Sequence, residues 1–170
     1  MQTARLTLAP LVDADIDELA GLLWDERVYE HIGGLPSGAD LVALGLRRAL
    51  AGPPAGRTSE RWLNYAVRLR ADRRLIGRLE ATVHDGIAEV AFLLAPLHWG
   101  HGFAQEGLGW LHDELSRVAP QSPCWATTLP ANVRSSRLLI ACGYEEVDPA
   151  TAPDLMTYDA GDRVFLRAGA

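Results

Sequence analysis

The sequence predicts a mixed α/β (α+β) fold, in which a central sheet of about six to seven strands is flanked by about four helices. Three observations support this fold class. Two runs between residues 63 and 83 alternate apolar side chains with polar or small ones, as half-buried strands do. Residues 104–118 repeat apolar side chains at helical spacing over about four turns. Residues 88–105 read as a buried strand, a glycine loop and the start of that helix. We expect a single domain over residues 1–170, because no internal repeat is present.

Length and composition limit the classes of function. The chain has 170 residues, of which 48% are hydrophobic and 22% charged, and this suits one domain with a sizeable core. The net charge of −6 argues against a nucleic-acid partner and suits an amine-bearing substrate, although solubility explains it equally well. Because there is neither a membrane-length apolar run nor a signal-like N-terminus, we expect a cytoplasmic protein without a membrane partner. Cys124 and Cys142 are expected to be reduced core thiols.

The first third of the chain predicts one strand and two helices. Residues 5–8 alternate and read as a strand. Asp13 and Asp15 can cap the helix that follows, which carries one apolar face. Ser37 is the expected cap of a second helix, which ends before the Gly-Pro-Pro of residues 52–54.

The middle of the chain predicts three strands and a helix. Residues 63–69 and 75–83 alternate in the manner of strands. Asp85–Gly86 is a strong hairpin signal, and it comes just before the continuous apolar run of residues 90–94. The amphipathic helix over residues 104–118 then follows the glycine loop.

The last third predicts a strand over residues 123–128 and a helix over residues 132–142. Gly143 stops this helix as a glycine just beyond its C-terminus. Residues 144–147 begin another strand, and residues 156–166 are expected to form a hairpin that completes the sheet.

The stretch from Ala88 to Gln105, AEVAFLLAPLHWGHGFAQ, carries the strongest functional signal. A glycine loop between a strand and a helix exposes backbone N–H groups at the positive end of the helix dipole, which suits a phosphate. A Walker loop is excluded because it needs a Lys, and the 16 basic residues are all Arg. A Rossmann fingerprint is excluded because Gln105 stands where its third glycine belongs. An ordinary strand-to-helix turn is the structural alternative.

Two motifs point to one family. Residues 99–104, WGHGFA, resemble the pyrophosphate loop Gln/Arg-x-x-Gly-x-Gly/Ala of the GNAT superfamily of acyl-CoA N-acyltransferases. Trp99 replaces the usual Gln or Arg, as is common in the branch resembling ribosomal-protein N-terminal acetyltransferases. Residues 132–144, NVRSSRLLIACGY, are similar to the family's C-terminal signature at the correct spacing. The resemblance covers roughly residues 61–147, and it implies the GNAT fold.

The resemblance implies that the protein transfers an acetyl group from acetyl-CoA to a primary amine. Direct attack in a ternary complex is expected, because no residue reads as an activated covalent nucleophile. Pantetheine would pair with the central strand edge, and the diphosphate would bind the loop N–H groups. The residues expected to bind acetyl-CoA are Phe92, Leu93, Leu94, Gly100, His101, Gly102, Phe103, Ala104, Gln105, Asn132 and Arg137. Asn132 is equally suited to a plain helix cap. No metal is expected, because no single helix carries both His98 and His101.

The same resemblance suggests the catalytic groups. Glu89 is expected to be the base that takes a proton from the amine, and a structural cross-strand partner is the alternative. Glu80 on the neighbouring strand is a second candidate. Leu139 stands where many relatives have a Tyr that protonates the leaving thiolate. Ser135 is expected to donate a hydrogen bond to that thiolate instead, or to cap the helix.

The acceptor class rests on the resemblance alone. A protein N-terminal amine is the first expectation, because of the WGHGFA and Asn-x-x-Ser variants, and a small-molecule amine such as an antibiotic or metabolite is the second. The absent Tyr also leaves open a non-catalytic acyl-CoA binding protein, and a structural partner protein is a further alternative. The resemblance allows a homodimer through an exposed last strand near Val164 to Leu166.

Overall fold

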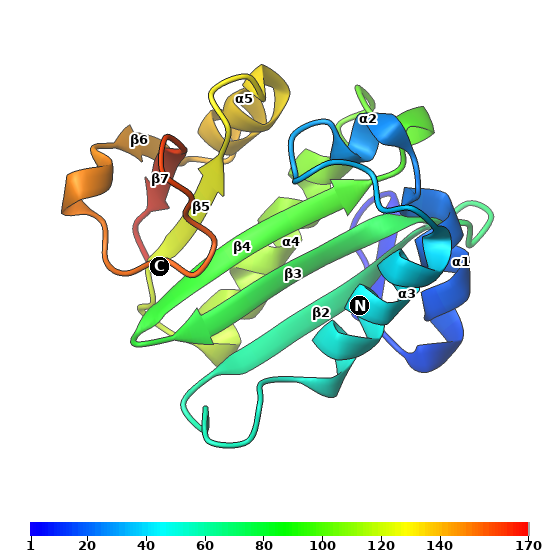
Figure 1. Cartoon of the computed structure of the whole chain (residues 1–170), viewed down its shortest axis with the longest axis horizontal. Coiled ribbons are helices and arrows are strands. Elements are labelled where there is room, and N and C mark those ends of the chain that lie inside the picture. The colour runs from blue at the N-terminus through cyan, green and yellow to red at the C-terminus, as the bar shows by residue number, and fades with distance from the viewer. Residues whose placement is uncertain (170) are drawn as a thin grey trace.

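A computed structural model of the chain describes residues 1–169 and contains a seven-stranded mixed sheet in the order β1-β2-β3-β4-β5-β7-β6 (Figure 1). Only the β4–β5 pair is parallel among the strand pairs of these residues. The predicted fold class is confirmed, with five α-helices within the described residues. The strands are β1 (Leu6–Pro10), β2 (Arg61–Leu69), β3 (Leu75–His84), β4 (Ile87–Leu94), β5 (Cys124–Thr128), β6 (Glu145–Val147) and β7 (Arg163–Arg167). The helices are α1 (Ile16–Leu23), α2 (Glu26–Tyr29), α3 (Ala39–Ala51), α4 (Phe103–Val118) and α5 (Val133–Ala141).

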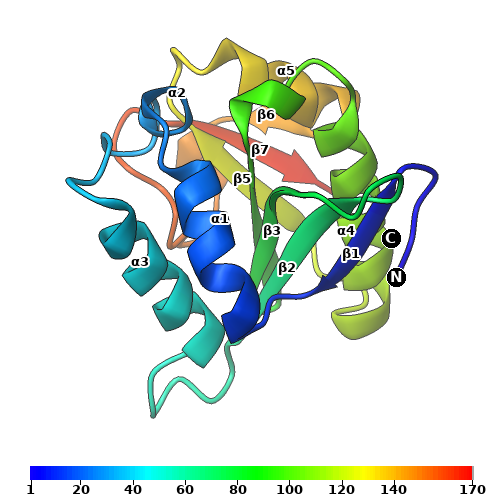
Figure 2. The same ribbon diagram turned by 90° about the vertical axis from the view of Figure 1, so that its right-hand side faces the viewer.

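Helices cover both faces of the sheet (Figure 2). α1 and α3 lie over β2 and β3 on one face, and α4 and α5 lie on the other. The larger core fills the space between the sheet and α4, where Leu79, Leu108 and Leu111 are fully buried. A smaller core lies beneath α1 and α3 around Ile16 and Leu19. No helix of residues 1–169 combines the length and the hydropathy that a membrane span needs.

Local sequence signals explain several of the connections. Asp85 and Gly86 have φ angles of 45° and 80° and join β3 to β4 in the predicted tight turn. Gly143 has a φ of 85° just beyond α5, as a helix-terminating glycine requires. The predicted Ser37 cap of α3 is wrong, because Gly38 is the extended residue before the helix. The short helix α2 was not predicted, and Asp25 caps it by accepting a hydrogen bond from the Arg27 N–H.

The C-terminal part of the fold differs most from the prediction. Residues 156–160 form turns and loop in place of the first strand of a hairpin. β7 instead inserts between β5 and β6 and is antiparallel to both. Val164 and Phe165 are consequently fully buried. The expectation of an exposed strand at Val164 to Leu166 is therefore wrong, since β6 forms that edge of the sheet.

Gly77 lets β4 approach β3 closely. A Cβ at this position would lie 2.1 Å from the Leu93 carbonyl oxygen and 2.7 Å from the Leu94 Cα. These are backbone atoms, so they cannot move aside as a side chain would. A side chain at position 77 would push away the part of β4 that carries Leu93 and Leu94.

We therefore predict that Gly77→Ala lowers the free energy of unfolding by about 3 kcal/mol, because the added methyl group overpacks a backbone contact. Gly109→Ala is the control, since Gly109 lies in α4 with nothing within 4 Å of its added Cβ. That control should be neutral or slightly stabilising. Urea denaturation measures both variants, and wild-type stability in Gly77→Ala would contradict the close approach.

A buried imidazole makes the stability of the fold depend on pH. His112 on α4 is 6% exposed, and its Nε2 lies 2.9 Å from the Tyr144 hydroxyl. Burial, aided by the charge of Arg167, lowers the pKa of His112 to about 4. The unfolded chain therefore binds a proton near pH 6.5 that the folded chain does not bind until about pH 4. Stability from this group is complete above pH 6.5 and is lost as the pH falls towards 4.

We predict that wild-type protein loses about 3 kcal/mol more stability between pH 7 and pH 4 than His112→Gln does. Gln retains hydrogen-bonding capacity towards Tyr144 but does not titrate. Urea denaturation over this pH range measures the difference between the two proteins. Parallel pH profiles would contradict the buried neutral imidazole.

Candidate functional site

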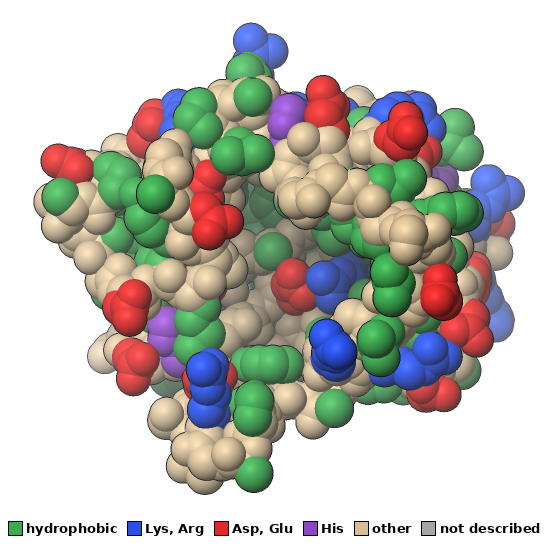
Figure 3. Space-filling model, viewed as in Figure 1, with side chains coloured by type: hydrophobic (Ala, Val, Ile, Leu, Met, Phe, Trp, Pro, Cys, Tyr) green, Lys and Arg blue, Asp and Glu red, His purple; other side chains and the backbone are tan. Residues whose placement is uncertain are grey.

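A deep cavity opens where β4 and β5 separate. The two strands pair only at Ala88 with Cys124 and at Glu89 with Trp125. Beyond Glu89, no strand of the described residues pairs with the β5-facing edge of β4. The resulting cavity has a volume of about 810 Å³ and lies between β4, β5, α5, the glycine loop and the α2–α3 connection. The face seen in Figure 3 is hollowed between the β5–β7 side of the molecule and the α2–α3 side.

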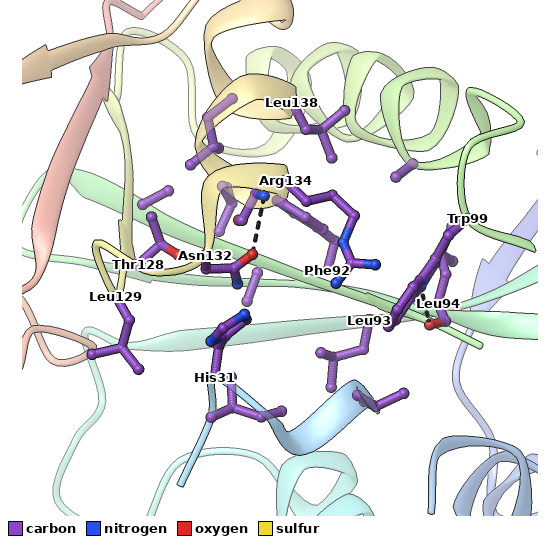
Figure 4. Close-up of a pocket in the computed structure, with 18 of the residues that line it drawn as sticks. His31, Phe92, Leu93, Leu94, Trp99, Thr128, Leu129, Asn132, Arg134 and Leu138 are labelled. Carbon is purple, nitrogen blue, oxygen red and sulfur yellow. Dashed lines mark hydrogen bonds between the residues drawn. The ribbon is translucent and has the colours of Figure 1, made fainter. Parts of the chain in front are cut away.

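The end of β4 forms one wall of this cavity. Phe92, Leu93 and Leu94, the three residues predicted for the pantetheine edge, all line it. The Trp99 indole Nε1–H donates to the Leu94 carbonyl over 2.7 Å, as Figure 4 shows. The pairing of β3 with β4 is continuous from Leu94 to Ile87, so the separation from β5 needs no bulge in β4. The backbone edge predicted for the cofactor arm therefore faces the cavity without a strand partner among residues 1–169.

The glycine loop supplies a set of free hydrogen-bond donors. Gly100 and Gly102 have φ angles of 78° and 77°, a conformation that glycine adopts without a Cβ penalty. The N–H groups of residues 100–105 have no hydrogen-bond acceptor in the described part of the chain. Gly102 is also the N-cap of α4, so the helix dipole adds to the positive potential. This loop can hold an anionic group such as a diphosphate.

The loop is tied to the N-terminal strand. The Arg5 guanidinium donates to the His101 carbonyl over 2.8 Å, and its Nε–H donates to the Glu106 carboxylate over 2.6 Å. Burial alone would raise the pKa of Glu106, but hydrogen bonds from Thr3 and Arg5 lower it. The charge of Glu106 is thus neutralised by Arg5 beside the loop. Most of the predicted loop residues line the cavity, namely Gly100, Gly102, Phe103, Ala104 and Gln105, whereas the His101 side chain does not.

Helix α5 forms the opposite wall. Asn132 caps it, because its Oδ1 accepts the Ser135 N–H over 3.1 Å (Figure 4). Asn132 and Ser135 both line the cavity, and the Ser135 hydroxyl has no hydrogen-bond partner within residues 1–169. Arg137 is exposed and lies outside the cavity lining, so the structure does not bring it to the groove. Arg134 takes the inner position, with its guanidinium carbon 3.6 Å from the centre of the Trp99 ring.

The predicted base, Glu89, is held away from the cavity lining. Its side chain is 1% exposed, and it accepts hydrogen bonds from His84 and from the backbone of Met156 and Thr157. Glu80 is paired with Arg78 over 2.8 Å and is also outside the lining. The geometry therefore assigns neither carboxylate a position in contact with a bound amine. The predicted catalytic role of Glu89 stays a prediction.

A buried Leu occupies the position at which many relatives have a Tyr. Leu139 is 1% exposed and contributes only an apolar surface to the cavity. Among the described residues, no Tyr side chain lines the cavity. Ser135, one helical turn earlier, is therefore the hydroxyl that α5 presents there.

Several lining residues escaped the sequence analysis. His31, in the connection after α2, points into the cavity from the side opposite α5 (Figure 4). Thr157, Asp159 and Asp162 line the cavity from the segment before β7. Neither segment has a motif, and both reach the cavity only through the arrangement of distant elements. The sequence favours a solvated helix face for Arg134 over a contact with CoA phosphates, whereas the structure places its guanidinium at the cavity beside Trp99.

Comparison with known proteins agrees with this geometry. The family described as Acetyltransferase (GNAT) domain matches residues 5–145. A search of curated proteins found no match to the chain. Among solved structures, the GNAT-family acetyltransferase from Bacillus anthracis is 15% identical with a TM-score of 0.76, and the match covers 99% of this chain and 97% of that one.

Two further neighbours are structures with CoA bound. Spermidine N-acetyltransferase from Vibrio cholerae, in complex with CoA and spermine, is 18% identical with a TM-score of 0.72, and the match covers 96% of this chain and 95% of that one. An aminoglycoside acetyltransferase in complex with coenzyme A is 20% identical with a TM-score of 0.72, covering 96% and 94%. At these identities the structures establish a shared fold, while the family match covers most of the chain. This chain therefore belongs to the GNAT acetyltransferase family, whose members use acetyl-CoA.

Proposed function

We propose that the protein is an N-acetyltransferase that moves an acetyl group from acetyl-CoA to a primary amine. The separation of β4 from β5 beside a donor-rich glycine loop carries this proposal. Few other arrangements would leave a strand edge and a phosphate-binding loop open to one elongated ligand. We also propose that residues 1–170 form one catalytic domain, which is supported by the near-complete coverage of the structural neighbours.

Acetyl-CoA would lie along the groove between β4 and α5. Its diphosphate would accept hydrogen bonds from the N–H groups of residues 100–105. Its pantetheine amides would pair with the free edge of Phe92 to Leu94 in the manner of an added strand. Arg134 stacks on Trp99 at the same groove and adds a positive charge near the phosphate loop. Asn132 would contact the CoA arm through its amide nitrogen, since its oxygen already caps α5.

The reaction would proceed by direct attack. The neutral amine nitrogen forms a bond to the thioester carbon, and the C–S bond breaks to release the CoA thiolate. Cavity lining within residues 1–169 includes neither Cys nor Lys, and no Ser paired with a base, so no covalent acetyl-enzyme is proposed. The Ser135 hydroxyl would donate a hydrogen bond to the thiolate. The proton leaving the amine would pass to water in the open cavity.

A protein N-terminus is the first acceptor candidate. An α-amine with a pKa near 7.8 is roughly one-seventh neutral at pH 7, whereas an alkyl amine with a pKa near 10.4 is neutral in roughly one molecule in 2,500. An α-amine therefore depends less on an enzymatic base. This suits a cavity whose predicted base, Glu89, lies outside the lining and already accepts hydrogen bonds from other groups.

A cationic small-molecule amine is the second candidate. Asp159 and Asp162 both line the cavity, and their negative charges would attract an acceptor with several ammonium groups. The spermidine and aminoglycoside acetyltransferases among the structural neighbours act on such amines by name. The two candidates therefore differ in how strongly they should depend on these carboxylates.

The cofactor site predicts a specific loss of binding. Gly102→Val should weaken acetyl-CoA binding by about 100-fold, or about 3 kcal/mol, because Val places a branched side chain at the donor-bearing loop. Gly86→Val is the matched control, because Gly86 has a φ of 80° and Gly102 a φ of 77°, and Gly86 lies in the β3–β4 turn. Isothermal titration calorimetry compares both variants with the wild type. Failure of the wild-type protein to bind acetyl-CoA would defeat the proposed function.

Removing the negative charges of Asp159 and Asp162 should distinguish the two classes of acceptor. If the acceptor carries several ammonium groups, the double variant Asp159→Asn/Asp162→Asn should raise the KM for spermidine by about 10-fold, since each lost charge pair is worth about 1 kcal/mol or less. If the acceptor is a protein N-terminus, a short peptide should be the better wild-type substrate, and its KM should change by less than about 3-fold.

Asp154→Asn is the control for this experiment, because Asp154 is exposed in the same segment but does not line the cavity. Steady-state assays of CoA release measure all three proteins with both acceptors. If the double variant raises the KM for neither acceptor, the two carboxylates do not take part in acceptor recognition.

A further inference from the structure

The carboxylate of Glu89 is fully occupied by hydrogen-bond donors. Oε1 accepts from the Met156 N–H over 2.7 Å and lies 2.7 Å from His84 Nε2. Oε2 accepts from the Thr157 N–H over 2.9 Å and from the Thr157 hydroxyl over 2.5 Å. An ionised carboxylate offers about four lone-pair positions, and four donors reach this one. No position is left to receive a proton from an approaching amine.

His84 completes this arrangement from the neighbouring strand. Its side chain is 2% exposed, and its Nδ1 lies 3.1 Å from the Asp85 carboxylate. Burial opposes protonation, but hydrogen bonds with Asp85 and Glu89 raise the pKa of His84. Because the Glu89 carboxylate can only accept, His84 Nε2 must carry the hydrogen that joins them. The ring therefore supports Glu89 in one orientation.

The segment that Glu89 holds is part of the cavity wall. The Thr127 hydroxyl on β5 donates to the Thr157 carbonyl over 2.8 Å, so this segment is joined to both separating strands. Leu155, just before it, is buried against Ile87 and Trp125. Residues 155–157 are thus anchored, and Thr157, with Asp159 beyond it, faces the cavity. Without secondary structure of its own, this segment depends on these contacts for its position.

We propose that Glu89 is a positioning residue: by fixing residues 156–157 it sets the position of Thr157 in the acceptor wall of the cavity. This role rests on the proposed acetyltransferase function, and it differs from that of the base. Glu89 reaches across from β4, the strand that also carries the cofactor edge. One strand therefore sets the distance between the acetyl donor and the wall that orients the amine.

Glu89→Gln tests this role. The amide NH₂ of Gln would face an N–H donor at a position where the carboxylate oxygen accepted a hydrogen bond. We expect the acceptor KM to rise by about 10-fold, kcat to change by less than about 3-fold, and acetyl-CoA affinity to stay unchanged. Amide hydrogen exchange at Met156 or at Thr157 should become at least about 10-fold faster, since the Gln side chain keeps a single oxygen and can accept from only one of these two N–H groups. Glu145→Gln, at an exposed position of β6, is the control and should leave all four quantities unchanged.

Thr157 provides an independent readout. Thr157→Val removes the hydroxyl donor and should raise the acceptor KM by more than Thr157→Ser does, because Ser keeps a hydroxyl that can donate to Glu89. The effects of Glu89→Gln and Thr157→Val on KM should be less than additive, because both break the same contact.

The exchange measurement separates this inference from the proposed function. If no amine is turned over by the wild type, the acetyltransferase proposal fails, while amide exchange still tests the contact. If Glu89→Gln instead slows turnover by about 100-fold or more, with unchanged KM and unchanged exchange, Glu89 is the base and the inference is overturned. Unchanged exchange at Met156 and Thr157 would overturn it whatever the activity.

Discussion

The function of this fold depends on one break in its hydrogen bonding: parallel strands β4 and β5 pair at Ala88 and Glu89 and then separate. Unpaired backbone groups buried away from water are costly, so an open strand edge persists only where solvent or a ligand satisfies it. Here the edge borders a cavity of about 810 Å³. The cavity is thus a consequence of sheet topology, and the sequence places donors around it.

Other contacts keep this break in place. Gly77 lets β3 stay paired with β4 as far as Leu94, so the end of β4 remains part of the sheet beyond the point where it separates from β5. Arg5 joins the glycine loop to the start of β1, which lies at the far side of the sheet. Glu89, the last residue of β4 that pairs with β5, directs its carboxylate to the segment before β7. The site is therefore held by contacts between elements far apart in the sequence.

Local chemistry made part of this structure predictable. Asp85–Gly86 and Gly143 adopt positive φ angles that few other residues tolerate, so they mark a turn and a helix end without any tertiary information. The glycine loop was found for the same reason, and the Asn132 cap was found because Asn is a preferred residue before the first turn of a helix. The insertion of β7 between β5 and β6 was not, because pairing between distant strands leaves no local pattern. His31 and Thr157 reach the cavity only after that assembly, and the two backbone partners of Glu89 lie 67 and 68 residues further along the chain.

The open edge of β4 and the glycine loop together are proposed to hold acetyl-CoA, and the remaining proposals depend on this. Amide hydrogen exchange of the full chain, with and without saturating CoA, tests it most directly because it reports on individual backbone N–H groups. We expect slower exchange at residues 92–94 and 100–105 when CoA is bound. Protection confined to another part of the chain, with these amides unchanged, would contradict it.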